Sequence, residues 1–116
     1  MEETARRIDV LASSEEDITC RTFVLHNEDH TLGNALRYII SKNPEIEYCG
    51  YSVPHPSIRN INFRIQTKSV PATDVLKKGL EDLQALCDHM HETFKKEVDE
   101  YKKMADIEKT LSEMDA

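Results

Sequence analysis

Residues 26–37 have the sequence HNEDHTLGNALR, in which a polar turn separates a β-rich segment from an amphipathic helix. Beyond the turn, apolar side chains recur three, four, seven and eight positions after Leu32, which places them along one side of a helix. Asp29 or Thr31 can cap the first free N–H groups, and Pro44 disfavours helical backbone at the residue before it. The sequence therefore predicts a helix from Thr31 to about Lys42 that buries one side.

Three segments have the composition of β-strands. Thr19–His26 is rich in β-branched and aromatic residues, and apolar residues occur at both its odd-numbered and its even-numbered positions. This pattern favours a central strand that is covered on much of both faces. Glu45–Val53 is the second segment, and the two prolines after it prevent a continuous ladder. Asn60–Thr67 alternates most regularly, with every second residue apolar. The short loop between the last two segments favours an antiparallel hairpin.

After Pro71 the apolar pattern becomes helical. Thr73 is a good N-cap, and apolar residues from Leu76 to Phe94 are spaced alternately four and three positions apart, continuing to Met104 after a small shift. A helix of about 30 residues is about 45 Å long, which is more than one three-stranded sheet can cover. The surplus apolar surface predicts that a second chain packs on this helix.

The order strand, helix, strand, strand, helix predicts an α+β domain of two layers, with two helices on one face of an antiparallel or mixed sheet. We expect three regions. Residues 1–17 form an acidic, flexible arm in which Thr4–Leu11 can be a short helix, residues 18–104 form the domain, and residues 105–116 form an acidic tail that frays.

The charge distribution argues against direct binding to nucleic acid. The chain of 116 residues has a net charge of −7, of which residues 1–17 carry −4, residues 18–96 carry +1 and residues 97–116 carry −4. A surface that binds phosphate groups needs a basic stripe. No run approaches the roughly 20 apolar residues of a membrane span. We therefore expect neither nucleic acid nor a membrane as a direct partner.

Few residues suggest chemistry. Cys20, Cys49 and Cys87 are odd in number and lack paired C-x-x-C spacing, which favours reduced thiols over a disulfide framework or a zinc site. Cys87 and His91 are one helical turn apart, so a thiol- or metal-dependent enzyme is an alternative, although no third ligand is close in sequence. We predict no catalytic residue, metal or cofactor. Gly33 is expected where another backbone approaches the first helix closely.

Three sequence blocks resemble those of the small alpha-like subunits of archaeal and eukaryotic RNA polymerases. The blocks are DHTLGN followed by LR in residues 29–37, YSVPHP in residues 51–56 and RIQT in residues 64–67, in the order and spacing of that family. The resemblance runs from about Thr19 to about Tyr101. The run EYCGYS in residues 47–52 is more similar to the subunit shared by RNA polymerases I and III than to its polymerase II counterpart, which stays an alternative.

The resemblance implies a fold like the dimerisation domain of the bacterial alpha subunit and a non-catalytic role in DNA-directed RNA polymerases I and III. Members of the family pair with a larger alpha-like subunit, and this heterodimer is the platform for the large catalytic subunits. The implied location is the nucleus, including the nucleolus, and no small-molecule substrate is implied. A self-pairing adaptor outside transcription is a further alternative. The two helices that carry the pairing imply the interface residues Leu32, Leu36, Arg37, Ile39, Leu83, Met90 and Phe94.

Overall fold

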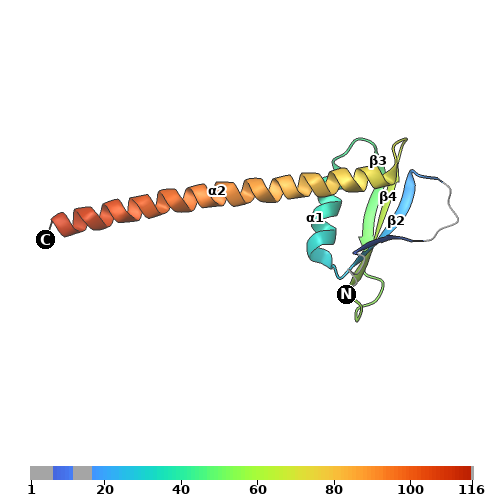
Figure 1. The fold of residues 1–116 in the computed structure, drawn as a ribbon, viewed down its shortest axis with the longest axis horizontal. Helices are drawn as coiled ribbons and strands as arrows, with labels where there is room; N and C mark the ends of the chain where they lie inside the picture. The colour runs from blue at the N-terminus through green and yellow to red at the C-terminus, as the bar shows by residue number, and fades with distance from the viewer. Residues whose placement is uncertain (1–6, 12–16, 116) are drawn as a thin grey trace, which may run out of the picture. The chain divides into compact units, whose positions relative to one another are not determined.

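A computed structural model describes residues 7–11 and 17–115 and has the predicted α+β fold (Figure 1). The described residues form two compact units, one that ends at Leu83 and one that begins at Gln84. The sheet is antiparallel with the strand order β1-β2-β4-β3. The elements are β1 (Ile8–Val10), β2 (Cys20–His26), α1 (His30–Ser41), β3 (Ile46–Ser52), β4 (Asn60–Thr67) and α2 (Ala72–Met114).

The first strand is the main departure from the sequence prediction. β1 pairs with residues 23–25 of β2, so in its described part the segment Thr4–Leu11 is a strand, neither the flexible arm that was expected nor the short helix that was considered possible. The His26 N–H donates to the Arg7 carbonyl at 2.8 Å, and His26 Nε2 lies 2.7 Å from Asp9 Oδ2. These cross-strand bonds are available to an extended segment, whereas an isolated helix of this length is marginal in water. The rest of the predicted arm, residues 1–6 and 12–16, lies outside the described residues.

The bounds of the other three strands were predicted to within one residue at each end, and the antiparallel β3–β4 hairpin is confirmed. β2 lies between β1 and β4, as expected for a central strand. Phe23 and Leu25 on its helix-facing side are buried, but Val24 on the opposite side is only half-buried. The expectation that both faces are well covered therefore holds for one face only.

The long helix differs from its prediction at both ends. It begins at Ala72, so Thr73 lies in the first turn and is not the N-cap. The carbonyl of Pro71 accepts the N–H groups of Asp74 and Val75, which are the first hydrogen bonds of the helix. The helix continues to Met114, ten residues beyond the predicted domain end at Met104. Fraying of residues 105–116 stays a prediction.

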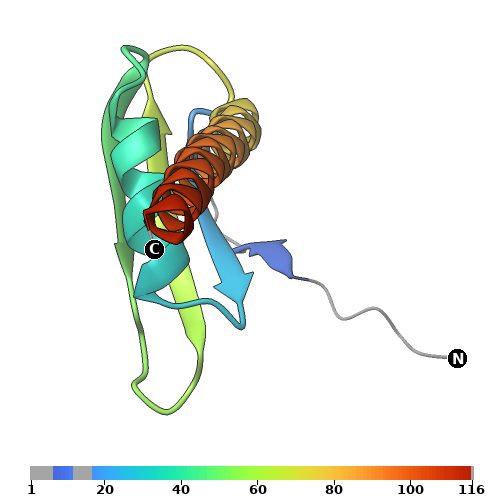
Figure 2. The ribbon, with the colours of Figure 1, turned by 90° about the vertical axis from the view of Figure 1, so that its left-hand side faces the viewer.

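The core lies between the sheet and the two helices, with α1 against β3 and β4 (Figure 2). Both helices contribute to the same buried cluster, so the prediction that they share one face of the sheet is confirmed. The alternation predicted for β4 is confirmed, because its apolar residues are all buried and the polar residues between them are half-buried. The buried core residues are Phe23, Leu25, Leu36, Ile40, Ile61, Phe63, Ile65, Ala72, Val75 and Leu76.

Candidate dimerisation interface

The start of α1 is fixed by its cap. The Asp29 carboxylate accepts the Thr31 N–H at 2.9 Å, which supplies one of the helix's free donors with a partner. Arg59, from the loop before β4, forms an ion pair with the same carboxylate at 3.0 Å. The hydrogen bonds from Thr31, followed by the Arg59 charge, hold the pKa of Asp29 below its usual value. Of the two predicted capping residues, the structure selects Asp29.

The second fixed point of α1 is Gly33, which is buried against β3 and β4. A Cβ atom at Gly33 would lie 2.9 Å from the ring of Tyr51 and 3.2 Å from Ile61 Cδ1. The close neighbours are therefore side chains, and the predicted approach of another backbone is wrong. The Tyr51 hydroxyl also lies 2.7 Å from His30 Nδ1, which joins the ring to the first residue of the helix. These contacts set the position of α1 on the sheet.

Within the first unit, α1 and the first turns of α2 meet at Gly79. A Cβ atom there would lie 2.4 Å from Ile40 Cγ1 and 3.5 Å from Leu36 Cδ1. The missing side chain therefore allows the two helices to approach closely, which buries Leu36 and Ile40 almost completely. The two helices form one packed layer in this unit.

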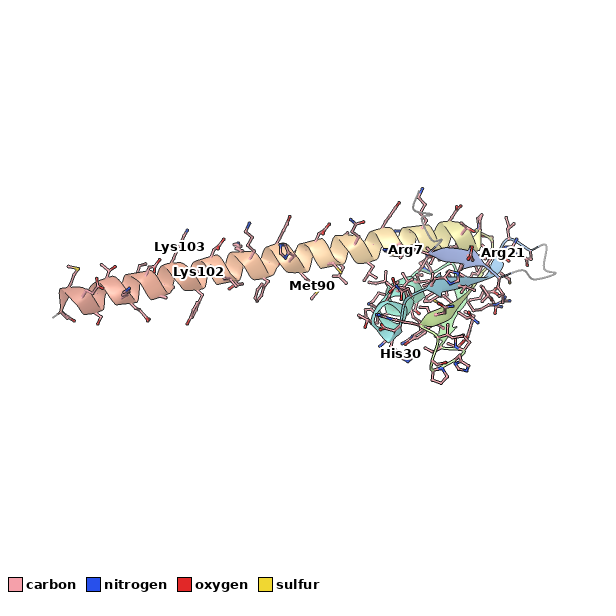
Figure 3. All side chains as sticks on the ribbon, turned by 60° about the horizontal axis from the view of Figure 1, so that its bottom comes forward. Arg7, Arg21, His30, Met90, Lys102 and Lys103 are labelled. Atoms are coloured by element: carbon pink, nitrogen blue, oxygen red, sulfur yellow. The ribbon has the colours of Figure 1, made fainter. Side chains whose placement is uncertain are left out.

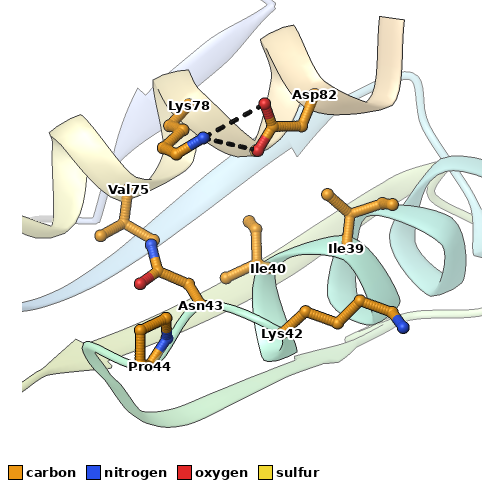
Figure 4. Close-up of a pocket in the computed structure, with 9 residues that line it drawn as sticks. Ile39, Ile40, Lys42, Asn43, Pro44, Val75, Lys78 and Asp82 are labelled. Atoms are coloured by element: carbon orange, nitrogen blue, oxygen red, sulfur yellow. Dashed lines mark hydrogen bonds and ion pairs between the residues drawn. The ribbon is translucent and has the colours of Figure 1, made fainter. Parts of the chain in front are cut away.

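A small cavity of about 230 Å³ lies between the end of α1 and the first turns of α2 (Figure 4). Ile39, Ile40 and Val75 are among its apolar walls, and Lys78 and Asp82 form an ion pair at its rim, 2.9 Å apart. None of the residues that line it is a histidine or a cysteine. An apolar cavity with one surface ion pair suits packing better than acid–base or thiol chemistry.

The predicted interface residues of the first unit have three different environments. Leu36 is 0% exposed, so it belongs to the intramolecular core and cannot contact a partner at the surface. Leu32, Ile39 and Leu83 are half-buried and keep part of their apolar surface exposed. Arg37 is exposed, and its Nη2 donates to Asn34 Oδ1 at 3.3 Å. The core assignment of Leu36 corrects its predicted place on the interface.

Tyr38 is a candidate contact residue that the sequence pattern missed. Its side chain is 58% exposed, and Lys42 Nζ lies 4.6 Å from the ring centroid in a cation–π contact. Tyr38 lies six positions after Leu32, off the spacing that marks the buried side of α1, so periodicity alone excluded it. An exposed aromatic ring beside Arg37 is typical of a protein interface.

The second unit is the part of α2 from Gln84 onward, and it exposes many apolar side chains (Figure 3). Met90 is 61% exposed, Phe94 69% and Tyr101 74%. Isolated apolar residues are normal on a surface, but a series this long marks an interaction site. Further exposed apolar residues of this unit are Leu86, Met104, Ile107, Leu111 and Met114.

The geometry gives little support to the alternative of a thiol- or metal-dependent enzyme. Cys87 is exposed and Cys49 is half-buried. Burial raises the pKa of the Cys49 thiol to about 11 against an opposing effect of the Arg37 charge, so this thiol is protonated at neutral pH. Within residues 7–11 and 17–115, no three or more His, Cys, Asp or Glu side chains are grouped so as to hold a metal ion.

Among the described segments, no helix combines the length and apolar composition needed to cross a lipid bilayer. Residues 20–93 match the model of the RNA polymerase Rpb3/Rpb11 dimerisation domain. The matched segment contains α1, three strands and the first half of α2, so it covers the packed layer of the first unit. It ends directly before Phe94.

Several curated proteins are similar to this chain over most of its length. The DNA-directed RNA polymerases I and III subunit RPAC2 of Schizosaccharomyces pombe is 56% identical over 95 residues, which cover 81% of this chain and 76% of that protein. The Drosophila melanogaster protein of the same name is 55% identical over 84 residues, 72% of this chain and 80% of the relative. A probable DNA-directed RNA polymerase II subunit RPB11 of Plasmodium falciparum is 28% identical over 101 residues.

A solved structure has the same fold. DNA-directed RNA polymerase subunit L of Thermoplasma acidophilum is similar with a TM-score of 0.68 and 24% sequence identity, covering 83% of this chain and 92% of that one. At this identity the likeness concerns the fold alone.

Proposed function

Because the chain belongs to the RNA polymerase Rpb3/Rpb11 dimerisation domain family, we propose that it is a non-catalytic assembly subunit of DNA-directed RNA polymerases I and III. The observation that carries this proposal is the long exposed apolar series of the second unit, which a chain working alone would leave in contact with water. An exposed apolar series of this length marks a contact site for another chain.

The partner in this proposal is the larger alpha-like polymerase subunit. The heterodimer then serves as the platform on which the large catalytic subunits assemble. The chain would act in the nucleus, including the nucleolus, and it needs no cofactor or small-molecule substrate for this role. Its contribution to RNA synthesis is the organisation of the enzyme, because the geometry of the described residues offers packing surfaces in place of a catalytic group.

The proposed contact residues lie on both helices. On α1 the proposed contacts are the half-buried Leu32 and Ile39 and the exposed Arg37 and Tyr38. On α2 the proposed contacts are Leu83 in the first unit and Met90 and Phe94 in the second. Leu36 supports the interface indirectly, because its burial holds α1 in place.

Polymerases I and III are favoured over polymerase II by the identity of the relatives. The relatives named for polymerases I and III are 43–56% identical to this chain, whereas the polymerase II protein of Plasmodium falciparum is 28% identical. The equivalent subunit of polymerase II stays the alternative within the same role.

The test is affinity purification of the tagged chain from nuclear extract at moderate salt, followed by mass spectrometry. Recovery of the larger alpha-like subunit with the largest subunits of polymerases I and III is the expected result. Recovery of polymerase II subunits would transfer the role to that enzyme. Recovery of the chain as a homodimer without polymerase subunits would contradict the proposal. A Phe94→Asp chain, which carries a charge on the exposed series, is the matched negative control.

A further inference from the structure

Two glutamates of the second unit fall on heptad positions, each next to an apolar residue, Val98 or Ile107. Beginning at Phe94, steps of alternately three and four residues follow one side of the helix, as in the seam of a coiled coil. The residues along this seam are Phe94, Glu97, Tyr101, Met104, Glu108 and Leu111. Glu97 and Glu108 are both exposed, and they lie beyond the segment that matches the family model. The family match therefore does not account for them.

Neither glutamate has a basic neighbour on its own helix. Side chains interact along a helix when they are three or four positions apart. Those positions around Glu97 hold Thr93, Phe94, Glu100 and Tyr101. Those around Glu108 hold Met104, Ala105, Leu111 and Ser112. The charge of each seam glutamate therefore lacks compensation from within the helix.

The lysines of this unit lie on other sides of the helix. Each comes one or two positions after Phe94, Tyr101 or Glu108, which turns it about 100° or 200° away from that residue. Figure 3 shows Lys103 and Met90 projecting from opposite sides of the helix. The positions that flank the seam from Leu86 to Ser112 also hold no lysine or arginine. A second copy of this helix, paired along the seam, could thus bring no lysine or arginine to it.

Self-pairing is consequently unfavourable along this helix. In a parallel pair of copies, Glu97 would face Glu97 and Glu108 would face Glu108. Charges of like sign that are brought together out of water repel each other, and each also loses hydration. Polar residues at single seam positions of coiled coils are known to fix the choice of partner for this reason.

We propose that the partner helix that packs on this seam carries lysine or arginine side chains opposite Glu97 and Glu108, and that these two ion pairs select the heterodimer over self-pairing. The inference rests on the proposed function, in which the larger alpha-like subunit supplies that helix. The two glutamates are 11 residues apart, so the two cations must be about 16 Å apart along the partner. The partner surface is therefore apolar with two basic positions at this spacing.

The first test compares two double variants that remove the same charge. Glu97→Gln with Glu108→Gln neutralises the seam, and Glu92→Gln with Glu113→Gln neutralises the opposite side of the helix. Binding of each full chain to the purified larger alpha-like subunit is measured at low and high salt. We expect the seam variant to bind about tenfold or more weakly at low salt and to lose most of its salt dependence. The control variant should stay within about twofold of the unaltered chain.

The second test concerns self-association. Sedimentation of the full chain alone should show a monomer, whereas Glu97→Leu with Glu108→Leu, which makes the seam apolar throughout, should form a homodimer. Circular dichroism of each variant verifies that the helix is intact. A heterodimer whose affinity is the same for the seam and control variants would overturn this inference alone. Absence of any complex with the larger subunit would overturn the proposed function and this inference with it.

Discussion

Gly79→Ala tests the close packing of α1 on α2. The added methyl group would lie 2.4 Å from Ile40 Cγ1 and 2.8 Å from Ile40 Cδ1. Cγ1 is held near the backbone of a β-branched residue that is only 2% exposed, so it cannot turn away into solvent. The helices must therefore separate or Ile40 must leave its preferred rotamer.

Two opposing effects determine how much Gly79→Ala changes the free energy of unfolding. Alanine is favoured over glycine inside a helix by about 1 kcal/mol. Forcing an extra methyl group into a packed core costs about 1–3 kcal/mol, and the 2.4 Å approach places this site toward the upper end. We therefore expect a net destabilisation of about 1–2 kcal/mol. Strain from overpacking outweighs the gain in helix propensity.

Urea unfolding followed by tyrosine fluorescence measures this change, because three of the four tyrosines lie in the first unit. Gly50→Ala is the matched control. A Cβ atom at Gly50 would lie 2.6 Å from the Tyr48 hydroxyl, but Tyr48 is 52% exposed and its ring can turn into solvent. We therefore expect the free energy of unfolding to change by no more than about 0.5 kcal/mol. A Gly79→Ala chain that is as stable as the original, or more stable, would refute the packing argument.

Three further predictions concern the core, the thiols and the helix cap. Leu36→Ala should lower the free energy of unfolding, measured in urea, by about 2–5 kcal/mol, because it leaves a cavity in the core. Phe94→Asp should leave the unfolding midpoint unchanged, because Phe94 is exposed, and should abolish co-purification of the partner. At pH 8, iodoacetamide should label Cys87 faster than Cys49 in peptide mass spectrometry, because burial raises the pKa of Cys49 to about 11, and equal rates would contradict this. The pKa of Asp29 in the folded chain is held below its ordinary value of 3.8, so the stabilisation from this cap is present above that pH and is lost as the pH falls through the lowered pKa. The difference in unfolding midpoint between Asp29→Ala and the original chain should therefore shrink below pH 4, and a difference that grows there would refute the cap.

The elements with a strong local period could be predicted from the sequence. β4 has the predicted bounds, and α1 differs from its prediction by one residue at each end. The spacing of apolar residues is a property of residues that are close in sequence, so it can be recognised without knowledge of the fold. β1 has three residues and no such period, and it exists because residues 23–25 offer it a hydrogen-bonded edge. That pairing is distant in sequence, which is why the prediction missed it.

By itself, the sequence determined which side of each helix is apolar, where the hairpin turns, and that α2 carries more apolar surface than one small sheet can cover. Only the tertiary structure decided what covers each apolar residue. Leu36 and Phe94 lie on equally apolar stripes, yet one is 0% and the other 69% exposed. The physical reason is that periodicity arises from the geometry of one helix, whereas burial depends on contacts with segments that are far away along the chain.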